Sequence, residues 1–173
     1  IDGNIGSQIS MKYPACILAG PNAKGTCISI AVAGKEQFQD AGARMIHLAP
    51  NTTSEIISKS IAANGGDATY RGKVKITKDA INSKSTVKCD TIILDDISRS
   101  DTIPDNIVCN DSSNINHEAT VSKISKEKLF YLMSRGLTED KAKELLIMGF
   151  IDKFREELPM EYAVELNALL KNY

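Results

Sequence analysis

The sequence is short of aromatic residues and has no excess of one charge. It contains no tryptophan, four phenylalanines and five tyrosines, and its formal net charge is −1. Chains that bind nucleic acid usually carry a basic stripe and aromatic side chains on which bases stack, so we expect no nucleic-acid partner. No apolar run approaches the roughly 18 residues of a membrane-spanning helix. We therefore expect a globular chain without a membrane partner.

The four cysteines lack the spacing of a common metal or redox motif. Cys16, Cys27, Cys89 and Cys109 form no CxxC pair, which zinc ribbons and thioredoxin-like sites require. Disulfides are possible, but a chain of this length without a secretory leader is expected to keep reduced thiols in a cytosol-like compartment. The chain begins with Ile rather than Met, so we expect it to be a fragment or a processed piece.

Residues 1–124 have the two-residue period of β-strands. In "TCISIAVA", Ile28 and Ile30 fall on one side, and in "YRGKVKIT", Val74 and Ile76 fall opposite three cations. This period predicts strands with one buried and one solvated face. Turn-forming clusters separate the strands without intervening helical patterns, which excludes βαβ units. A sandwich, a barrel or a β-solenoid remain, and the lack of a clear two-residue hairpin turn favours the solenoid.

After these strands the sequence becomes helical. We expect Ser125 to cap a helix that runs to Arg135, and Thr138 to cap a second helix that ends at Gly149. The run "FIDKFREEL" follows, and Pro159 is expected to open a last helix. Three or four short helices cannot bury all their apolar surface alone. They must pack on the β part or on another protein.

A set of sequence strings points to a known family. In chain order they are "MKYPACIL", "QDAGARMIHLAPNTTSEIISKSI", "YRGKVKI", "KCD", "NHEATVSKIS", "LFYLMSRGL" and "ELPMEYAVELN". Over essentially the whole chain, the sequence resembles the SufB/SufD family of the SUF iron–sulfur cluster assembly system. The likeness is to the C-terminal portion, and "HEAT", where SufD typically has Gly after the His, together with "YRG" and "ELPMEYAVELN", makes the sequence more similar to SufB than to SufD. The resemblance implies a right-handed parallel β-helix over residues 1–124 and a small α-helical domain over residues 125–173.

The same resemblance implies a function and a set of partners. It implies a non-enzymatic scaffold on which iron–sulfur clusters are assembled transiently, in a complex with the SufC ATPase. SufC would dock on the C-terminal helices, SufD or a second SufB would bind the β-helix, and a cysteine desulfurase system would deliver sulfur. A reduced flavin is associated with the intact complex, although nothing in this sequence marks a flavin site. The implied location is the cytoplasm, or the plastid stroma in a eukaryote.

Two other functions remain open. A SufD-like structural subunit would organise the ATPase complex without holding a cluster. A β-solenoid hydrolase acting on polysaccharide would display acidic residues along one face of stacked strands, often beside aromatic platforms. Here only the loop acids Asp95, Asp96, Asp101 and Asp105 cluster, and aromatics are sparse. The glycine-rich "ANGGDATYRG" lacks the GK[ST] of a phosphate-binding loop, so ATP is expected on the partner.

Cys89 has two interpretations. By parity it shares a strand face with Val87 and Ile93, which alone predicts a buried, inert thiol. The resemblance instead assigns it to the site where the cluster is built, because a thiolate is both an iron ligand and a sulfur acceptor. A buried Cys89 would then need an opening motion, which the ATPase could drive.

The adjacent pair of His117 and Glu118 lies where the strands give way to helices. From the residues alone it is an exposed polar pair in a boundary loop. The resemblance assigns both as ligands beside Cys89, and a mixed Cys, His and carboxylate set holds iron less tightly than four thiolates. Many SufB sequences have a Glu immediately before this His. Here Asn116 stands there, so no role is transferred to it.

The remaining candidates have structural interpretations. Cys16 and Cys27 lie in strand-like runs and are expected in the core, whereas Cys109 is expected to be exposed. His47 is expected to face solvent or a second packing face. Residues 138–166 are the candidate docking surface for the ATPase, with packing on the chain's own β part as the alternative.

Overall fold

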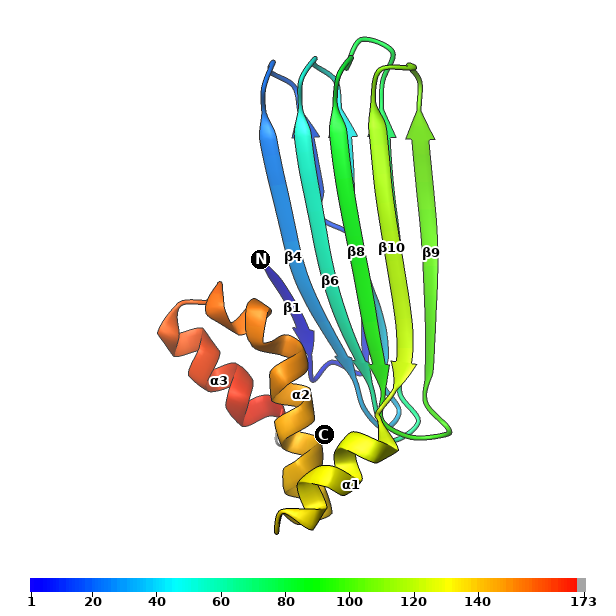
Figure 1. Ribbon diagram of the computed structural model, residues 1–173. Helices are drawn as coiled ribbons and strands as arrows, with labels where there is room; N and C mark the ends of the chain where they lie inside the picture. The colour runs from blue at the N-terminus through cyan, green and yellow to red at the C-terminus, as the bar shows by residue number, and fades with distance from the viewer. Residues whose placement is uncertain (171–173) are drawn as a thin grey trace.

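The computed structural model describes residues 1–170, which form two facing parallel sheets and three helices (Figure 1). Residues 171–173, the end of the expected helical domain, lie outside the described residues. Sheet A has the order β1 (Asp2–Ile5), β4 (Lys24–Ala33), β6 (Thr53–Ala62), β8 (Lys84–Ile93) and β10 (Asn114–Lys123). Sheet B contains β2 (Ile9–Lys12), β3 (Ala15–Leu18), β5 (Phe38–His47), β7 (Asp67–Ile76) and β9 (Arg99–Val108).

The chain alternates between the sheets, so each strand pairs with a strand of the next turn. Ser29 on β4 lies beside Ser58 on β6, which in turn lies beside Cys89 on β8. All pairings are parallel, and the side chains of one turn therefore stack on equivalent positions of the next. The expected mainly β fold, a parallel β-solenoid followed by a small C-terminal helical region, is confirmed.

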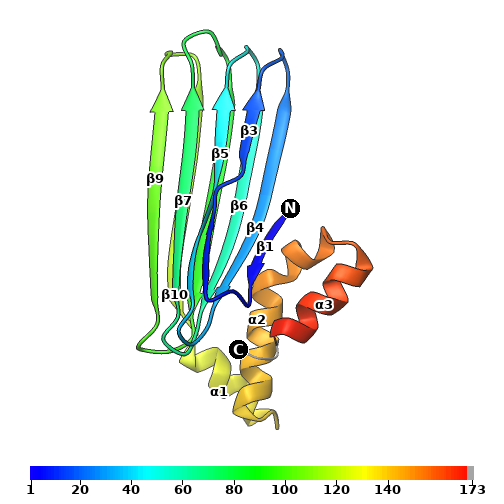
Figure 2. The same ribbon diagram turned by 180° about the vertical axis from the view of Figure 1, so that it is seen from behind.

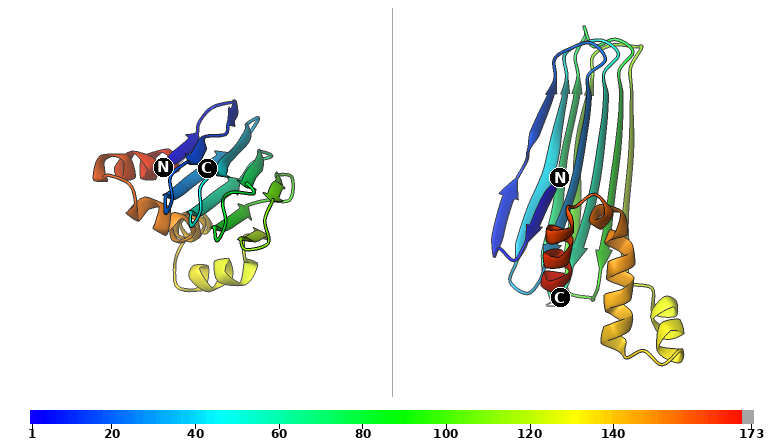
Figure 3. Two further views of the ribbon diagram at one scale, coloured as in Figure 1. Left: turned by 90° about the horizontal axis from the view of Figure 1, so that it is seen from above. Right: turned by 90° about the vertical axis from the view of Figure 1, so that its left-hand side faces the viewer.

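Helices cover part of the outer face of sheet A (Figure 1). Helices α2 (Glu139–Glu156) and α3 (Met160–Leu170) lie against β1 and β4, beside the N-terminal turns (Figures 1 and 3). The buried outward residues Ile30, Val32 and Ile61 pack with helical residues in one apolar cluster. Burying such side chains is worth about 1.5–3 kcal/mol each. The expected solvated face is therefore wrong for β4: the face of small residues lines the solenoid interior, and the Ile/Val face lies under the helices.

Sheet B follows the expected alternation. On β7, Val74 and Ile76 are buried inside the solenoid, whereas Arg71 and Lys75 are exposed outside. The outer face of this sheet is seen in Figure 2, with the helices lying beyond its edge and end. Charged residues can occupy this face because no helix of the described chain packs over β7 and β9.

The three helices begin at the predicted caps. Ser125 accepts a hydrogen bond from the Lys128 amide at the start of α1 (Lys126–Ser134), and Thr138 does so for Lys141 at α2 (Glu139–Glu156). Helix α3 (Met160–Leu170) follows directly after Pro159. None of these helices is long and apolar enough to span a bilayer.

The prediction that the second helix ends at Gly149 is wrong. Helix α2 continues through it to Glu156. Ile147, Ile151 and Phe154 keep the helical spacing on both sides of the glycine and are all buried against sheet A. Their packing outweighs the roughly 1 kcal/mol that a glycine costs inside a helix.

A buried polar network lies in the interior where the chain turns from sheet B to sheet A. His47 is 0% exposed, its Nδ1 lies 2.7 Å from the Thr52 hydroxyl, and its Nε2 lies 2.9 Å from the Ser54 hydroxyl. The Ser54 hydroxyl in turn donates to Ser85 at 2.8 Å. Of the two positions expected for His47, the solvent-facing one is wrong: the side chain is buried, in a structural role. The imidazole joins a network in which these hydroxyls also bond Ala49, Ser83 and Ser85, so both of its nitrogens have partners.

Candidate functional site

Neighbouring strands bring Cys89 and His117 together. In the parallel register of β8 and β10, Cys89 lies beside Ala119 and His117 lies beside Val87. Both side chains therefore face the solenoid interior, because residues two apart on a strand share a face. The Cys89 Sγ and the His117 Nε2 are 3.6 Å apart. That distance permits a hydrogen bond that involves sulfur.

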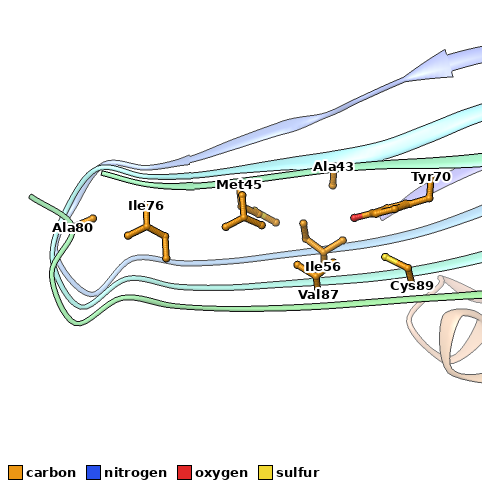
Figure 4. Packing of buried hydrophobic residues seen from close by; sticks show 9 residues of the cluster. Ala43, Met45, Ile56, Tyr70, Ile76, Ala80, Val87 and Cys89 are labelled. Atoms are coloured by element: carbon orange, nitrogen blue, oxygen red, sulfur yellow. The ribbon is translucent and has the colours of Figure 1, made fainter. Parts of the chain in front are cut away.

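Cys89 is buried in an apolar setting. Its side chain is 3% exposed and belongs to a core cluster with Ile56, Tyr70 and Val87 (Figure 4). Burial raises the pKa of the Cys89 thiol to about 12, while the nearby Tyr70 hydroxyl acts in the opposite direction. The sulfur is therefore protonated at neutral pH. A reaction that needs the thiolate must first remove this proton.

His117 sits between a sulfur and an amide. Its Nδ1 lies 3.3 Å from the Nδ2 of Asn106 on β9, and its Nε2 faces Cys89. Burial lowers the pKa of His117, so the neutral imidazole is favoured. With the Asn106 amide nitrogen donating to Nδ1, the ring proton is on Nε2. If the amide turns to present its oxygen, it accepts from Nδ1–H and leaves Nε2 free to bind a metal.

Sequence reasoning missed Asn106. Its position follows from the register, which places it beside Val74 and hence on the inner face of β9. The string "DTIPDNIV" has no alternation that marks this face. Only the completed pairing of β7 with β9 identifies Asn106 as a partner of His117.

Glu118 does not join the pair. It lies beside Lys88 in the register, on the face of β10 opposite to that of His117, and it is exposed. Asn116 lies on the same outward face and is also exposed. Within residues 1–170, no three His, Cys, Asp or Glu side chains are grouped so as to hold a metal ion. The inner site thus offers one thiol and one imidazole.

The pair lies next to an open end of the solenoid. Strands β9 and β10 form the outer edges of sheets B and A at this end. The inward positions Ala119 and Val121 of β10 are exposed, whereas Cys89 and Thr91, beside them on β8, are buried. Strand β9 also contains Pro104, which has no backbone N–H to offer a further strand. A single layer of structure therefore separates Cys89 from the solvent at this end.

The other cysteines are placed as expected. Cys16 and Cys27 are partly buried and pack against the same core cluster as Cys89, and Cys109 is exposed. All four cysteines are free. Burial raises the pKa of Cys27.

The fold and the site define a parallel β-solenoid with a thiol–imidazole pair at its open end. Residues 1–150 match the model of the SufBD core domain of SUF-system FeS cluster assembly. The chain is 60% identical over 171 residues to the iron–sulfur cluster assembly protein SufB of Bacillus subtilis. It is 59% identical, over the same length, to SufBD family proteins of Staphylococcus haemolyticus and Staphylococcus aureus.

These matches cover 99% of this chain and 37% of each relative. The chain therefore belongs to the SufB/SufD family of iron–sulfur cluster assembly proteins, and it corresponds to little more than a third of its relatives' length.

Proposed function

We propose that this chain is part of a scaffold on which nascent iron–sulfur clusters are assembled, with Cys89 and His117 at the assembly site. The observation that carries the proposal is the 3.6 Å separation of the Cys89 Sγ and the His117 Nε2 beside the open end. A thiolate accepts sulfur and binds iron, and a neutral imidazole is a suitable second ligand. Membership of the family supplies the iron–sulfur chemistry.

The donor set suits a site that must release what it builds. Four thiolates hold a cluster firmly, whereas one thiolate and one imidazole leave other iron positions for sulfide or for a partner's ligands. Iron and sulfide are here the substrates, and the cluster is the product. Two inward donors thus provide an anchor rather than a complete cage.

Glu118 has a separate place in this proposal. It faces away from Cys89, so its carboxylate is offered at the outer surface of β10, where a second subunit would reach it. We assign it to the subunit-facing side of the assembly site. This assignment requires no change in the register of β10.

Because Cys89 is buried, the partner ATPase would have to drive an opening that exposes its thiol. At 3% exposure the thiol is closed to iron, so the end of the solenoid must open before a cluster can form. The helical region would carry the SufC ATPase, since it exposes apolar side chains at Phe130, Tyr131, Met160, Tyr162 and Val164. Helix α1 joins directly to β10 through residues 124 and 125, so a movement of the helices reaches the His117 strand.

The edge strands suit the remaining partners. SufD or a second SufB would bind at β10 and β9, whose edges are unpaired in the described chain. A cysteine desulfurase system would deliver the sulfur. Equal labelling rates of Cys89 with and without ATP in the intact complex would contradict the opening step.

The test is anaerobic reconstitution of the full-length protein and its ATPase with iron and sulfide. The variants are Cys89→Ser and His117→Ala, with Cys109→Ser as a matched control because that thiol is exposed and follows the end of β9. Iron and acid-labile sulfide per chain are measured. Loss in the first two variants and not in the control supports the proposal. Unchanged content in all three moves the site elsewhere in the protein.

Among residues 1–170, the site brings together two donors, one thiol and one imidazole, which also favours a second candidate, a SufD-like structural subunit that organises the ATPase complex without a cluster. The same experiment separates the two. No iron or sulfide on the wild-type protein, with the complex intact, would establish the structural role.

A further inference from the structure

The hydroxyl group of Tyr70 is buried and meets no oxygen or nitrogen partner. Tyr70 lies on β7, is 2% exposed and points into the solenoid. In the described part of the chain, its Oη is one of four buried side-chain polar atoms that have no partner. Burying a hydroxyl without a partner is unfavourable, so such a group needs an explanation.

The surroundings of Tyr70 leave sulfur as the acceptor. Its neighbours in and against the core cluster are aliphatic apart from Met45, Cys89 and the partly buried Cys16 and Cys27. Of these sulfurs, that of Cys89 is the one whose hydrogen bonding affects the Tyr70 hydroxyl. Figure 4 shows Tyr70 and Cys89 next to each other, projecting inward from opposite sheets, with Met45 further along the interior. A thioether is a weak acceptor in every state of the protein, whereas a thiol becomes a strong one when it loses its proton or is ligated.

Gly72 fixes the position of this hydroxyl. It lies two residues beyond Tyr70, on the same inner face of β7. A Cβ atom added to Gly72 would lie 2.5 Å from the Tyr70 Oη and 2.7 Å from its Cε1. The ring therefore lies along its own strand, over bare backbone. Any larger residue at this position would displace the hydroxyl.

A second donor approaches the same sulfur from β10. With Asn106 donating to the Nδ1 of His117, the Nε2 carries the proton and faces the Cys89 Sγ at 3.6 Å. We propose that the Tyr70 hydroxyl is the hydrogen-bond donor reserved for the sulfur of Cys89, held in place by Gly72. Tyr70 is then a positioning residue, which acts on the site only through Cys89.

The consequence for assembly rests on the function proposed above. A thiolate in an apolar interior is costly, and a hydroxyl donor beside it lowers that cost. Donors that face a ligating sulfur also raise the reduction potential of the iron to which it is bound. Tyr70 would therefore favour the reactive form of Cys89 and tune the product. Removal of the hydroxyl leaves the ring packing unchanged.

The first test needs neither iron nor sulfide. Raman spectroscopy of the reduced full-length protein gives the S–H stretching band of Cys89 as the difference from Cys89→Ser. Loss of the hydroxyl changes the hydrogen bonding of the sulfur, so Tyr70→Phe is expected to shift the band. Gly72→Ala, which keeps the hydroxyl but displaces it, should move the band in the same direction. Tyr131→Phe on the exposed face of α1 is the control.

A band that stays fixed in Tyr70→Phe overturns the inference. The melting temperature should be unchanged or higher in this variant, because an unpaired hydroxyl has been removed. A large fall in melting temperature would instead assign Tyr70 a purely structural role.

The second test uses protein loaded with iron and sulfide, in which Tyr70→Phe should shift the reduction potential to a more negative value. A shifted Raman band together with cluster content that does not depend on Cys89 would retain the hydrogen bond and reject the proposed function. An unmoved band together with cluster content that does depend on Cys89 would do the reverse.

Discussion

The two histidines of this chain occupy similar positions and have opposite surroundings. His47 and His117 both sit on solenoid strands with side chains turned inward, and burial lowers the pKa of each. Both nitrogens of His47 meet hydroxyl groups, at 2.7 and 2.9 Å. His117 instead faces a thiol at 3.6 Å and an adaptable amide at 3.3 Å. The short hydrogen bonds at both nitrogens of His47 are typical of a structural residue. The longer contacts of His117, to groups that can change partners, leave its imidazole able to bind a ligand.

The largest expected difference is in stability. His47→Ala removes a buried ring and leaves the hydroxyls of Thr52 and Ser54 short of a partner, which should lower the free energy of unfolding by about 2–4 kcal/mol. His117→Ala, at the open end, should lower it by about 1 kcal/mol or less. Urea unfolding of the full-length protein measures both. Equal losses would remove the distinction between the two histidines.

The next effect is on cluster content. Asn106→Ala removes the amide that orients His117, and such outer partners of a ligand change metal affinity by about 10–100-fold. We expect the affinity of the reconstituted protein for iron to fall by about tenfold. The free energy of unfolding should stay within about 0.5 kcal/mol of wild type. Asn110→Ala is a poor control because its amide binds the Thr77 carbonyl. Asn114→Ala, exposed at the start of β10, is suitable.

A pH titration sharpens the same comparison. Because the folded-state pKa of His47 lies below its unfolded value near 6.5, its contribution to stability is complete above about pH 6.5 and is lost as the pH falls toward the folded-state pKa. His47→Gln should therefore flatten the acid limb of a plot of melting temperature against pH. His117→Gln should flatten it less, because its partly exposed ring is more readily hydrated when charged. An acid limb identical in wild type and His47→Gln would contradict this assignment.

The smallest expected effect concerns Glu118. In the isolated full-length protein, Glu118→Gln should leave stability unchanged within about 0.5 kcal/mol, since the side chain is exposed. Its effect on iron content should appear only when a second subunit is present, because the carboxylate faces outward. Loss of iron in the isolated subunit would place Glu118 inside the site after all.

Much of the fold could be predicted from local chemistry. Alternating residues and missing hairpin turns indicated a solenoid, and Ser125 and Thr138 marked helix starts through their capping hydroxyls. These signals are local, since a cap or an alternation depends on residues within one turn or strand. The end of the second helix was not predictable at Gly149, because the packing that carries the helix past it comes from sheet A.

The site was less accessible from the sequence. The likeness to a family, rather than any pattern, identified Cys89 and His117, and only the register brought them together. His47 was assigned to the wrong face because both faces of β5 carry apolar residues, Met45 on the inner face and Ile46 on the outer one. Alternation alone therefore could not say which face points inward. Asn106, Tyr70 and Gly72 act through contacts between strands that lie far apart in the sequence. Such contacts exist only once the turns are stacked.

The proline of β9 has a consequence for how such a fold avoids growing into a fibre. The last turn of a parallel β-solenoid has edge strands with unpaired backbone N–H and C=O groups. Another chain can pair with these groups and extend the sheets. At Pro104 the edge strand β9 lacks one backbone N–H donor. The edge strand β10 contains no proline and keeps all of its N–H donors. A strand that adds to β9 would lack one backbone hydrogen bond, whereas a strand that adds to β10 would not. The pyrrolidine ring of Pro104 therefore disfavours amyloid-like elongation along β9, while β10 stays able to pair with a partner subunit.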